Sequence, residues 1–369
     1  MRGFLLAGVS AVAFVAPAAA HHPGTGGNTG SAGAIYTISA DTLAAGGFAA
    51  GLMYEYIKLG GLSDAQLISA AAQHQHVHSI GTIQSPSLGL AYGLTDDLMV
   101  SLRIPYVKRT DIREGHHEHD EDTGVASNTV DFRGDSAGIG DIAVLAQYRF
   151  YKTQATSTAL LLGFRAPTGV TNRRDAQGEL FEAEFQPGSG AFSGLFGLAF
   201  SYRFAPAWQF DVSGLYTLTG TGTQDTNLGD RFNYNMAVTW RAFGAVPFDP
   251  LSGDIANARA HDTGPTHKHG RTARTPANHD HDHGPESTRP PWALDFVLEL
   301  NGEWHDKQVE AGVKDPNSGG NTVYLSPGVR LSVNNVSGFL SVGIPVANNL
   351  NGLQSSPDYR VVTGIAAAF

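Results

Sequence analysis

Residues 111–122, DIREGHHEHDED, concentrate imidazole and carboxylate side chains in one short stretch. His116, His117 and His119 stand there among glutamates and aspartates. Nitrogen and oxygen ligands of this kind suit Zn²⁺, Ni²⁺, Co²⁺ or Cu²⁺. A solvated acidic loop has the same composition, and without surrounding hydrogen bonds to fix its ligands it would bind metal only modestly. The stretch therefore predicts either a weak metal site or an exposed surface loop.

A second histidine cluster, HQHVH, places His74, His76 and His78 two positions apart. On a strand all three side chains would share one face, whereas on a helix only His74 and His78 would. Either geometry presents two metal ligands together, and a chance cluster in a polar loop is the alternative.

A third group lies in a Pro- and His-rich insert at about residues 249–290. His-rich tracts are typical of metal binding, and the alternative is a plain spacer. We expect no required cofactor, only weakly bound Zn, Cu, Ni or Co. The candidate ligands in this insert are His267, His269, His279, His281 and His283.

Enzymatic chemistry is not indicated by the sequence. There is no cysteine and no G-x-S-x-G elbow, phosphate-binding loop or H-E-x-x-H motif. His305 is the only histidine at a position expected in a strand. The net charge of −10 argues against nucleic-acid binding.

The N-terminus has the pattern of a secretory signal peptide over residues 1–20. Arg2 supplies the charge, an apolar run follows, and APAAA provides small residues for cleavage. Residues 21–46 are rich in Gly, Ser and Thr, and we expect a flexible segment there. Residues 47–369 then form the folded unit.

Apolar and polar residues alternate with a period of two through most of the chain after residue 47. The segments at 98–106, 142–150, 192–204 and 292–305 are the clearest examples. Many are longer than a usual strand and match the roughly 9–11 residues of a tilted membrane strand. Aromatic residues gather at the segment ends, where interfacial girdles occur.

The connections between these segments alternate between short and long. Short ones lie at 95–97, 152–156, 205–207 and 334–335, and long ones at about 59–81, 109–138, 168–190, 306–320 and 347–356. Outer-membrane barrels have short periplasmic turns and longer outer loops. The sequence therefore predicts an all-β, antiparallel up-and-down transmembrane barrel of about twelve strands, with both termini on the periplasmic side. Residues 249–290 would then be a periplasmic insert, and residues 63–73 could form a short helix.

The last alternating segment ends at Phe369. A terminal aromatic on a last strand resembles the signal by which barrel-assembly machinery recognises bacterial outer-membrane proteins. We therefore expect a bacterial outer-membrane location, contact with outer-membrane lipid, and a monomer.

The polar faces of the segments would point into the barrel. Barrels of about eight strands are filled by side chains and those of 16–18 hold a water channel, so twelve strands lie between. The charges could line a narrow pore or pair across it. The expected pore-lining residues are Arg103, Asp141, Arg149, Arg165, Asp211, Arg231, Arg241, Asp295, Glu299, Glu303 and Arg330.

Two stretches carry a family resemblance. GIGDIAVLAQYRF (138–150) and LLGFRAPTG (161–169) are similar to the Gly-Asp strand start and Pro-Thr-Gly strand exit of the family named for the MetA pathway of phenol degradation. Residues 85–109 fit the same pattern. The resemblance implies an outer-membrane transport barrel and supplies no catalytic residues. The histidine tracts depart from the pattern and point to a subset of such barrels that handles metal.

Together these observations predict an outer-membrane channel or transport component for small solutes, linked to transition-metal ions through its His-rich loops. Two alternatives stay open. One is a non-conducting outer-membrane metal-binding or surface protein, and the other is a channel for small aromatic or hydrophobic compounds.

Overall fold

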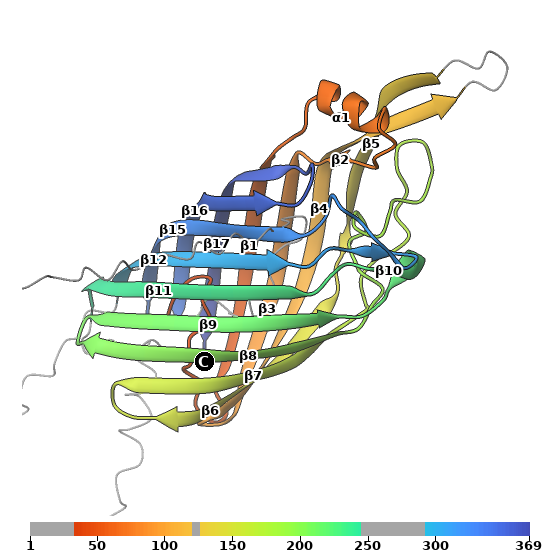
Figure 1. The fold of residues 1–369 in the computed structure, drawn as a ribbon. Coiled ribbons are helices and arrows are strands. Elements are labelled where there is room, and N and C mark those ends of the chain that lie inside the picture. The colour runs from red at the N-terminus through yellow and green to blue at the C-terminus, as the bar shows by residue number, and fades with distance from the viewer. Residues whose placement is uncertain (1–32, 120–125, 245–291) are drawn as a thin grey trace, which may run out of the picture.

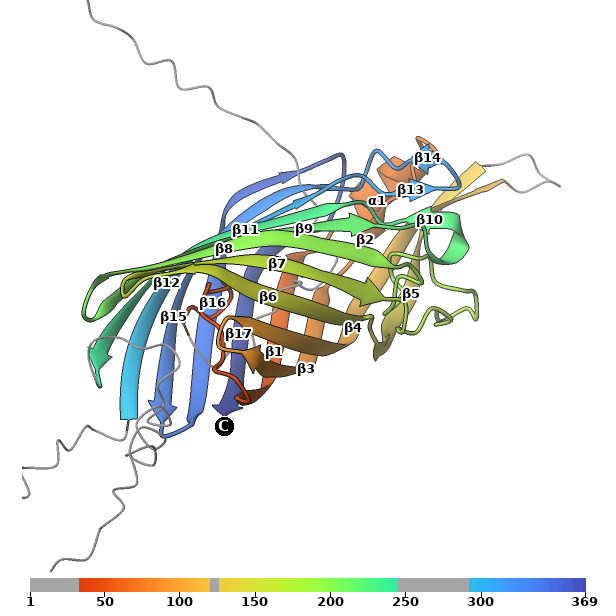
Figure 2. The ribbon, with the colours of Figure 1, turned by 90° about the horizontal axis from the view of Figure 1, so that it is seen from below.

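The computed structural model describes residues 33–119, 126–244 and 292–369. Within these ranges, twelve strands close an antiparallel barrel (Figures 1 and 2), and the predicted fold is confirmed. No helix in these ranges is long and apolar enough to cross a membrane. The barrel strands are β1 (Phe48–Gly60), β3 (Thr82–Thr95), β4 (Leu98–His119), β6 (Ile142–Lys152), β7 (Thr156–Ala166), β8 (Ser193–Ala205), β9 (Trp208–Thr219), β11 (Arg231–Phe243), β12 (Trp292–His305), β15 (Gly320–Val333), β16 (Val336–Leu350) and β17 (Ser356–Ala368).

The barrel closes where the first and last strands pair. β1 and β17 run antiparallel with Leu52 opposite Ile365, and the backbones of Phe48 and Phe369 exchange hydrogen bonds. Both strand ends therefore lie at one rim, together with the short turns. By the usual arrangement of such barrels this is the periplasmic rim.

The two faces of the barrel wall follow the alternation in the sequence. Leu52 is 61% exposed, whereas Glu55, three positions later on the same strand, is 1% exposed. Successive side chains of a strand point to opposite faces, so the apolar set faces outward and the polar set inward. An apolar exterior around a polar interior suits a barrel embedded in lipid.

Aromatic side chains stack along the outer wall near the periplasmic rim. The rings of Trp208 and Trp240 are 5.7 Å apart, and that of Phe296 follows Trp240 at 5.8 Å. Phe243 and Trp292 form a further pair at 5.6 Å. The expected girdle is thus present on adjacent strands at this end.

The prediction of a loop at residues 109–138 is wrong, because strands cover most of these residues. β4 continues to His119 and pairs with β5 (Ala126–Ile139), so the two form a hairpin beyond the end of β3 (Figure 1). In β5 polar residues still alternate with Val130 and Phe132. The backbone N–H and C=O groups of β4 and β5 form hydrogen bonds with each other, as in any antiparallel pair. Helix α1 (Asp64–Ala71) lies beside this hairpin and is capped by Ser63 and Gln66, which confirms the short helix.

The outer connections contain the remaining short elements. β2 (His78–Ser79) pairs with the projecting part of β4. The 3-10 helix η1 (Thr223–Asp225) follows β9. Strands β10 (Thr226–Asn227), β13 (Val309–Glu310) and β14 (Val313–Lys314) form a small separate sheet.

Residues 33–46, called here the inner segment, are not a flexible lead-in: residues 33–43 are almost all buried inside the barrel, and residues 44–46 are exposed (Figure 2). The backbone N–H groups of Ile38 and Ala40 donate to the hydroxyls of Ser213 and Ser201 on the inner wall, at 3.2 and 2.8 Å. Small residues allow a chain to pass through a narrow interior, and inward polar side chains satisfy its backbone. The expectation for 21–46 is therefore corrected over residues 33–46, and residues 21–32 lie outside the described ranges.

A second stretch also folds inward. Residues 181–189 of the connection between β7 and β8, called here the inner loop, are almost all buried. Phe181 and Phe185 pack on a cluster of isoleucines and Leu59 at the outer end of the barrel. The interior is thus occupied from the periplasmic side by the inner segment and from the outer side by the inner loop.

Candidate functional site in the barrel interior

The charged side chains that face the interior have two kinds of partner. Some pair along the wall, as Arg241 and Asp295 do on adjacent strands at 2.8 Å. Others hold the inner segment: Glu299 accepts backbone hydrogen bonds from Tyr36 and Thr37, at 3.0 and 2.9 Å. Charges that the sequence assigns to pore lining therefore bind a piece of the chain itself.

Asp41 fixes the middle of the inner segment. Its carboxylate lies 2.8 Å from the Arg203 guanidinium and accepts a hydrogen bond from Ser157 at 3.0 Å. Arg149 approaches Asp41 at 4.0 Å and binds Asp97 at 2.8 Å. Farther along, Arg330 donates to the backbone carbonyl oxygens of Gly33 and Ala34. The segment is anchored over its whole described length.

Arg360 forms the most enclosed of these contacts. Its guanidinium lies 4.2 Å from the ring centres of both Tyr36 and Tyr324. It also pairs with Glu303 at 3.2 Å and lies 3.9 Å from Glu55. The sequence analysis did not single out Arg360, although it stands on the polar phase of the last strand.

A partly open cavity lies in the interior beside the inner loop. It is lined by residues of β4, β6, β7 and β11 and by Gln186–Ser189 of the inner loop. Part of the wall is apolar, from residues such as Pro105, Val107 and Leu228. Four guanidinium groups supply most of its polar lining: Arg103, Arg109, Arg165 and Arg231.

The single carboxylate that lines this cavity is already engaged. Asp141 accepts hydrogen bonds from the backbone of Gly169 at 2.9 Å and from the backbone and hydroxyl of Ser189 at 2.8 and 2.6 Å. It stands at the break between β5 and β6, next to Gly140. Asp141 therefore positions the inner loop, and one negative charge stands against four positive ones.

Some of the arginine contacts are to neutral acceptors. Arg109 reaches the carbonyl oxygens of Phe185 and Gln186 at 3.4 and 3.2 Å, and Arg231 donates to Nε2 of His305 at 3.0 Å. The Nη2 atom of Arg165 is buried and makes no hydrogen bond within the described residues. Four guanidinium groups around a single lining carboxylate give this wall an excess of positive charge, which favours a bound anion. The sequence analysis missed Arg109, which also lies on the polar phase of its strand.

Every residue expected to line the pore faces the interior, but only some of these residues line the cavity. Arg103, Asp141, Arg165 and Arg231 line the cavity. Asp211 is enclosed by Ser201 and Gln209, at 2.5 and 2.9 Å. The others are committed to ion pairs or to the inner segment, as described above, and their role in lining a pore remains a prediction.

The predicted histidine ligands fall into several places. The rings of His74 and His117 meet edge to face at 4.5 Å, and His117 also pairs with Asn128 at 2.7 Å. His76 is well exposed and His116 is exposed. The structure describes neither the side chain of His119 nor any part of five further predicted ligands, which are His267, His269, His279, His281 and His283.

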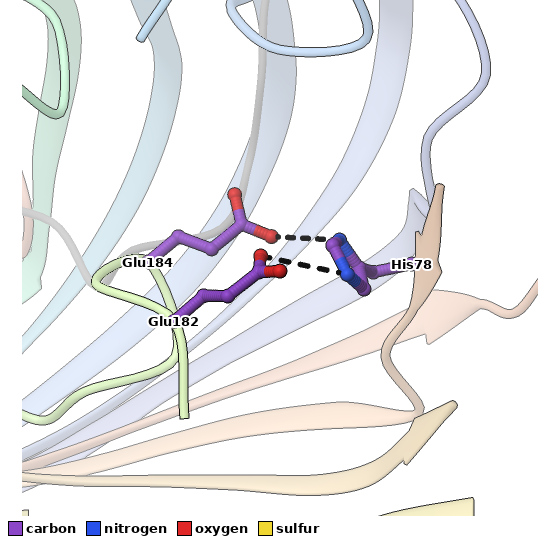
Figure 3. A group of neighbouring side chains, drawn as sticks. All are labelled: His78, Glu182 and Glu184. Atoms are coloured by element: carbon purple, nitrogen blue, oxygen red, sulfur yellow. Dashed lines mark ion pairs between the residues drawn. The ribbon is translucent and has the colours of Figure 1, made fainter. Parts of the chain in front are cut away.

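His76 and His116 each lie 3.8 Å from one carboxylate, Glu114 and Glu118, whereas His78 meets three. Figure 3 shows Glu182 and Glu184 of the inner loop pointing toward its ring, and their ion-pair distances are 3.5 Å from Nε2 and 3.3 Å from Nδ1. Glu114 of β4 approaches Nε2 at 3.5 Å. Burial alone would lower the pKa of His78, but the surrounding carboxylates raise it well above its ordinary value. Glu182 and Glu184 sit in an irregular loop, where no sequence periodicity could have marked them.

Comparison with known proteins supports this architecture. Residues 94–250 match the family described as "Putative MetA-pathway of phenol degradation". The COG4313 outer membrane channel from Pseudomonas putida F1 is similar in fold, with a TM-score of 0.53 and 14% identity over 89% of this chain and 97% of that one. No curated protein matches the sequence.

Two other barrels are more distant. The Ralstonia pickettii toluene transporter TbuX has a TM-score of 0.41 and 9% identity, over 89% of this chain and 90% of that one. A Pseudomonas aeruginosa FadL homologue has a TM-score of 0.35 and 7% identity, over 88% and 90%. The family resemblance expected from the sequence is confirmed by the match over residues 94–250. The chain is therefore a β-barrel of the bacterial outer membrane whose central part carries the sequence features of the phenol-degradation MetA-pathway family.

Proposed function

We propose that this barrel is a channel for small organic anions with an apolar body, of which aromatic carboxylates are the representative class. The observation that carries the proposal is the interior cavity, where four arginines and one engaged aspartate share a wall with apolar side chains. An outer-membrane barrel with such an interior has the means to bind a solute on its way through. The similarity in fold to the COG4313 outer membrane channel supports a transport role.

The charge of the cavity sets the expected selectivity. A hydrogen bond to a charged group contributes about 1.5–3 kcal/mol, and about 1.4 kcal/mol corresponds to a tenfold change in affinity. A carboxylate that meets one or two of these guanidinium groups is thus favoured over a cation of equal size by about tenfold or more. The apolar wall accommodates the rest of the molecule.

Uptake into liposomes tests this proposal with two aromatic solutes of similar size, benzoate and benzylammonium. The full-length protein is expected to admit benzoate about tenfold faster. The double substitution Arg165→Gln and Arg231→Gln is expected to bring the two rates close together, because it removes two of the four cavity charges. Lys314→Gln serves as the control, since that side chain is exposed in the outer sheet.

Equal uptake of both solutes by the full-length protein would contradict charge selection. No uptake of either, together with no single-channel current, would favour the non-conducting metal-binding or surface protein. The metal-linked channel expected from the histidine tracts would show instead as passage of Zn²⁺ that the arginine substitutions leave unchanged.

A further inference from the structure

We propose that His78, Glu182 and Glu184 bind one divalent transition-metal ion of the Zn²⁺ class, between β2 and the inner loop. The three side chains offer one nitrogen and two oxygen atoms that all lie within 4.8 Å of one another. They come from two distant parts of the chain, and Figure 3 shows them converging. The proposal does not rest on conduction, because metal binding can be measured without it.

The donor set suits such an ion. Zn²⁺ takes imidazole nitrogen at about 2.0–2.1 Å and carboxylate oxygen at about 2.0–2.2 Å, so tetrahedral ligands stand roughly 3.4 Å apart. The 3.5 Å between Nε2 of His78 and Glu182 is close to that spacing, whereas Glu184 lies 3.3 Å from the other ring nitrogen, Nδ1. One ring nitrogen binds the ion, and the carboxylate beside the other nitrogen reaches it by rotation of its side chain.

Neighbouring groups already orient the ligands. Gln308 donates to Oε2 of Glu184 at 2.8 Å, which leaves Oε1 facing the His78 ring. Hydrogen bonds of this kind around a ligand typically change metal affinity by about 10–100-fold. The site is therefore more than a chance meeting of exposed side chains.

The charge balance also calls for a cation. Glu114, Glu182 and Glu184 surround one imidazole, and Arg133 pairs with Glu114 at 2.9 Å. The buried Nε2 atom of His78 makes no hydrogen bond within the described residues, although two carboxylates approach it. Either a bound metal or a proton on His78 can offset these charges, and the two outcomes are separable by experiment.

A bound ion would tie the inner loop to the barrel wall. Glu182 and Glu184 lie two to four residues before Gln186, which is the first inner-loop residue on the cavity wall. The metal would thus hold in place the loop that forms one side of the cavity. An ion that binds only the native state also stabilises it.

The test is Zn²⁺ titration of the full-length protein in detergent, with bound Zn²⁺ counted by equilibrium dialysis and the unfolding temperature followed in parallel. Glu182→Gln with Glu184→Gln is the main variant, because both changes preserve shape. It is expected to lose one equivalent of Zn²⁺, or to bind it more than about tenfold more weakly, and to lose the Zn²⁺-dependent rise in unfolding temperature. His78→Ala is expected to do the same.

His116→Ala is the matched control, since His116 is exposed and its ring lies 3.8 Å from Glu118, which is not one of the three ligands. It is expected to retain the high-affinity equivalent that the other variants lose, as well as the rise in unfolding temperature. If the main variant bound Zn²⁺ with unchanged stoichiometry and affinity, the proposal would be overturned, and a protonated His78 would be the sole partner of these carboxylates.

Discussion

Deletion of residues 33–43 is expected to raise the single-channel conductance of the barrel several-fold. These residues make up most of the inner segment, which runs through the interior and is buried against several strands. A barrel of this size lies between those filled by side chains and those with a water-filled lumen, so an internal strand of chain takes up much of the free cross-section. Planar-bilayer recording of the deletion variant and the full-length protein measures the difference.

Replacement of residues 33–43 by a Gly/Ser segment of equal length separates occupancy from anchoring. This variant keeps the chain length but loses the hydrogen bonds of Asp41 and the apolar contacts of Ile35 and Ile38. We expect a conductance between the other two, with frequent transitions. A deletion variant that conducts no better than the full-length protein would show that the inner loop alone closes the barrel.

Arg360→Met is expected to lower the free energy of unfolding by about 3–5 kcal/mol, because removing one member of a buried ion pair leaves its partners uncompensated. Arg360 is 1% exposed and lies against the carboxylates of Glu303 and Glu55. Its contacts with Tyr36 and Tyr324 would be lost as well. Urea unfolding in detergent measures the change.

A second substitution makes this result specific. Adding Glu303→Gln to Arg360→Met removes one of the uncompensated charges, so the double variant is expected to recover part of the lost stability. Arg360→Lys keeps the charge but not the planar guanidinium, and an intermediate loss is expected. If Arg360→Met unfolded at the same urea concentration as the wild type, the network around it would contribute nothing to stability.

The barrel wall could be predicted because the face to which each side chain points depends only on its position along its own strand. A period of two decides which side chains face lipid, and residues such as Leu198 and Glu299 show it directly in the sequence. Turn positions followed from the same pattern. The projecting β4–β5 hairpin was missed because its acidic and histidine residues suggest solvent, although a hairpin can satisfy the backbone equally well in that setting.

The interior could be predicted only in part. The inward positions of Arg165 and Asp295 follow from alternation. Their partners do not, because Asp295 pairs with Arg241, 54 positions earlier in the chain, only once the strands lie side by side. Gly- and Ser-rich composition gives no sign that residues 33–46 enter the barrel. The pairing of His78 with Glu182 and Glu184 depends on a loop that folds inward, which no periodic pattern encodes.

The position of the inner segment also constrains the order of assembly. Its anchors stand on strands that are synthesised after it, including Ser201 on β8, Glu299 on β12 and Arg360 on β17. The contacts of the inner segment therefore cannot all form until nearly all strands of the barrel wall have been synthesised. Either the sheet forms around an inner segment that is already in place, or the inner segment enters after β1 and β17 have paired. In both cases the contacts of the inner segment are complete only when the last strand has formed.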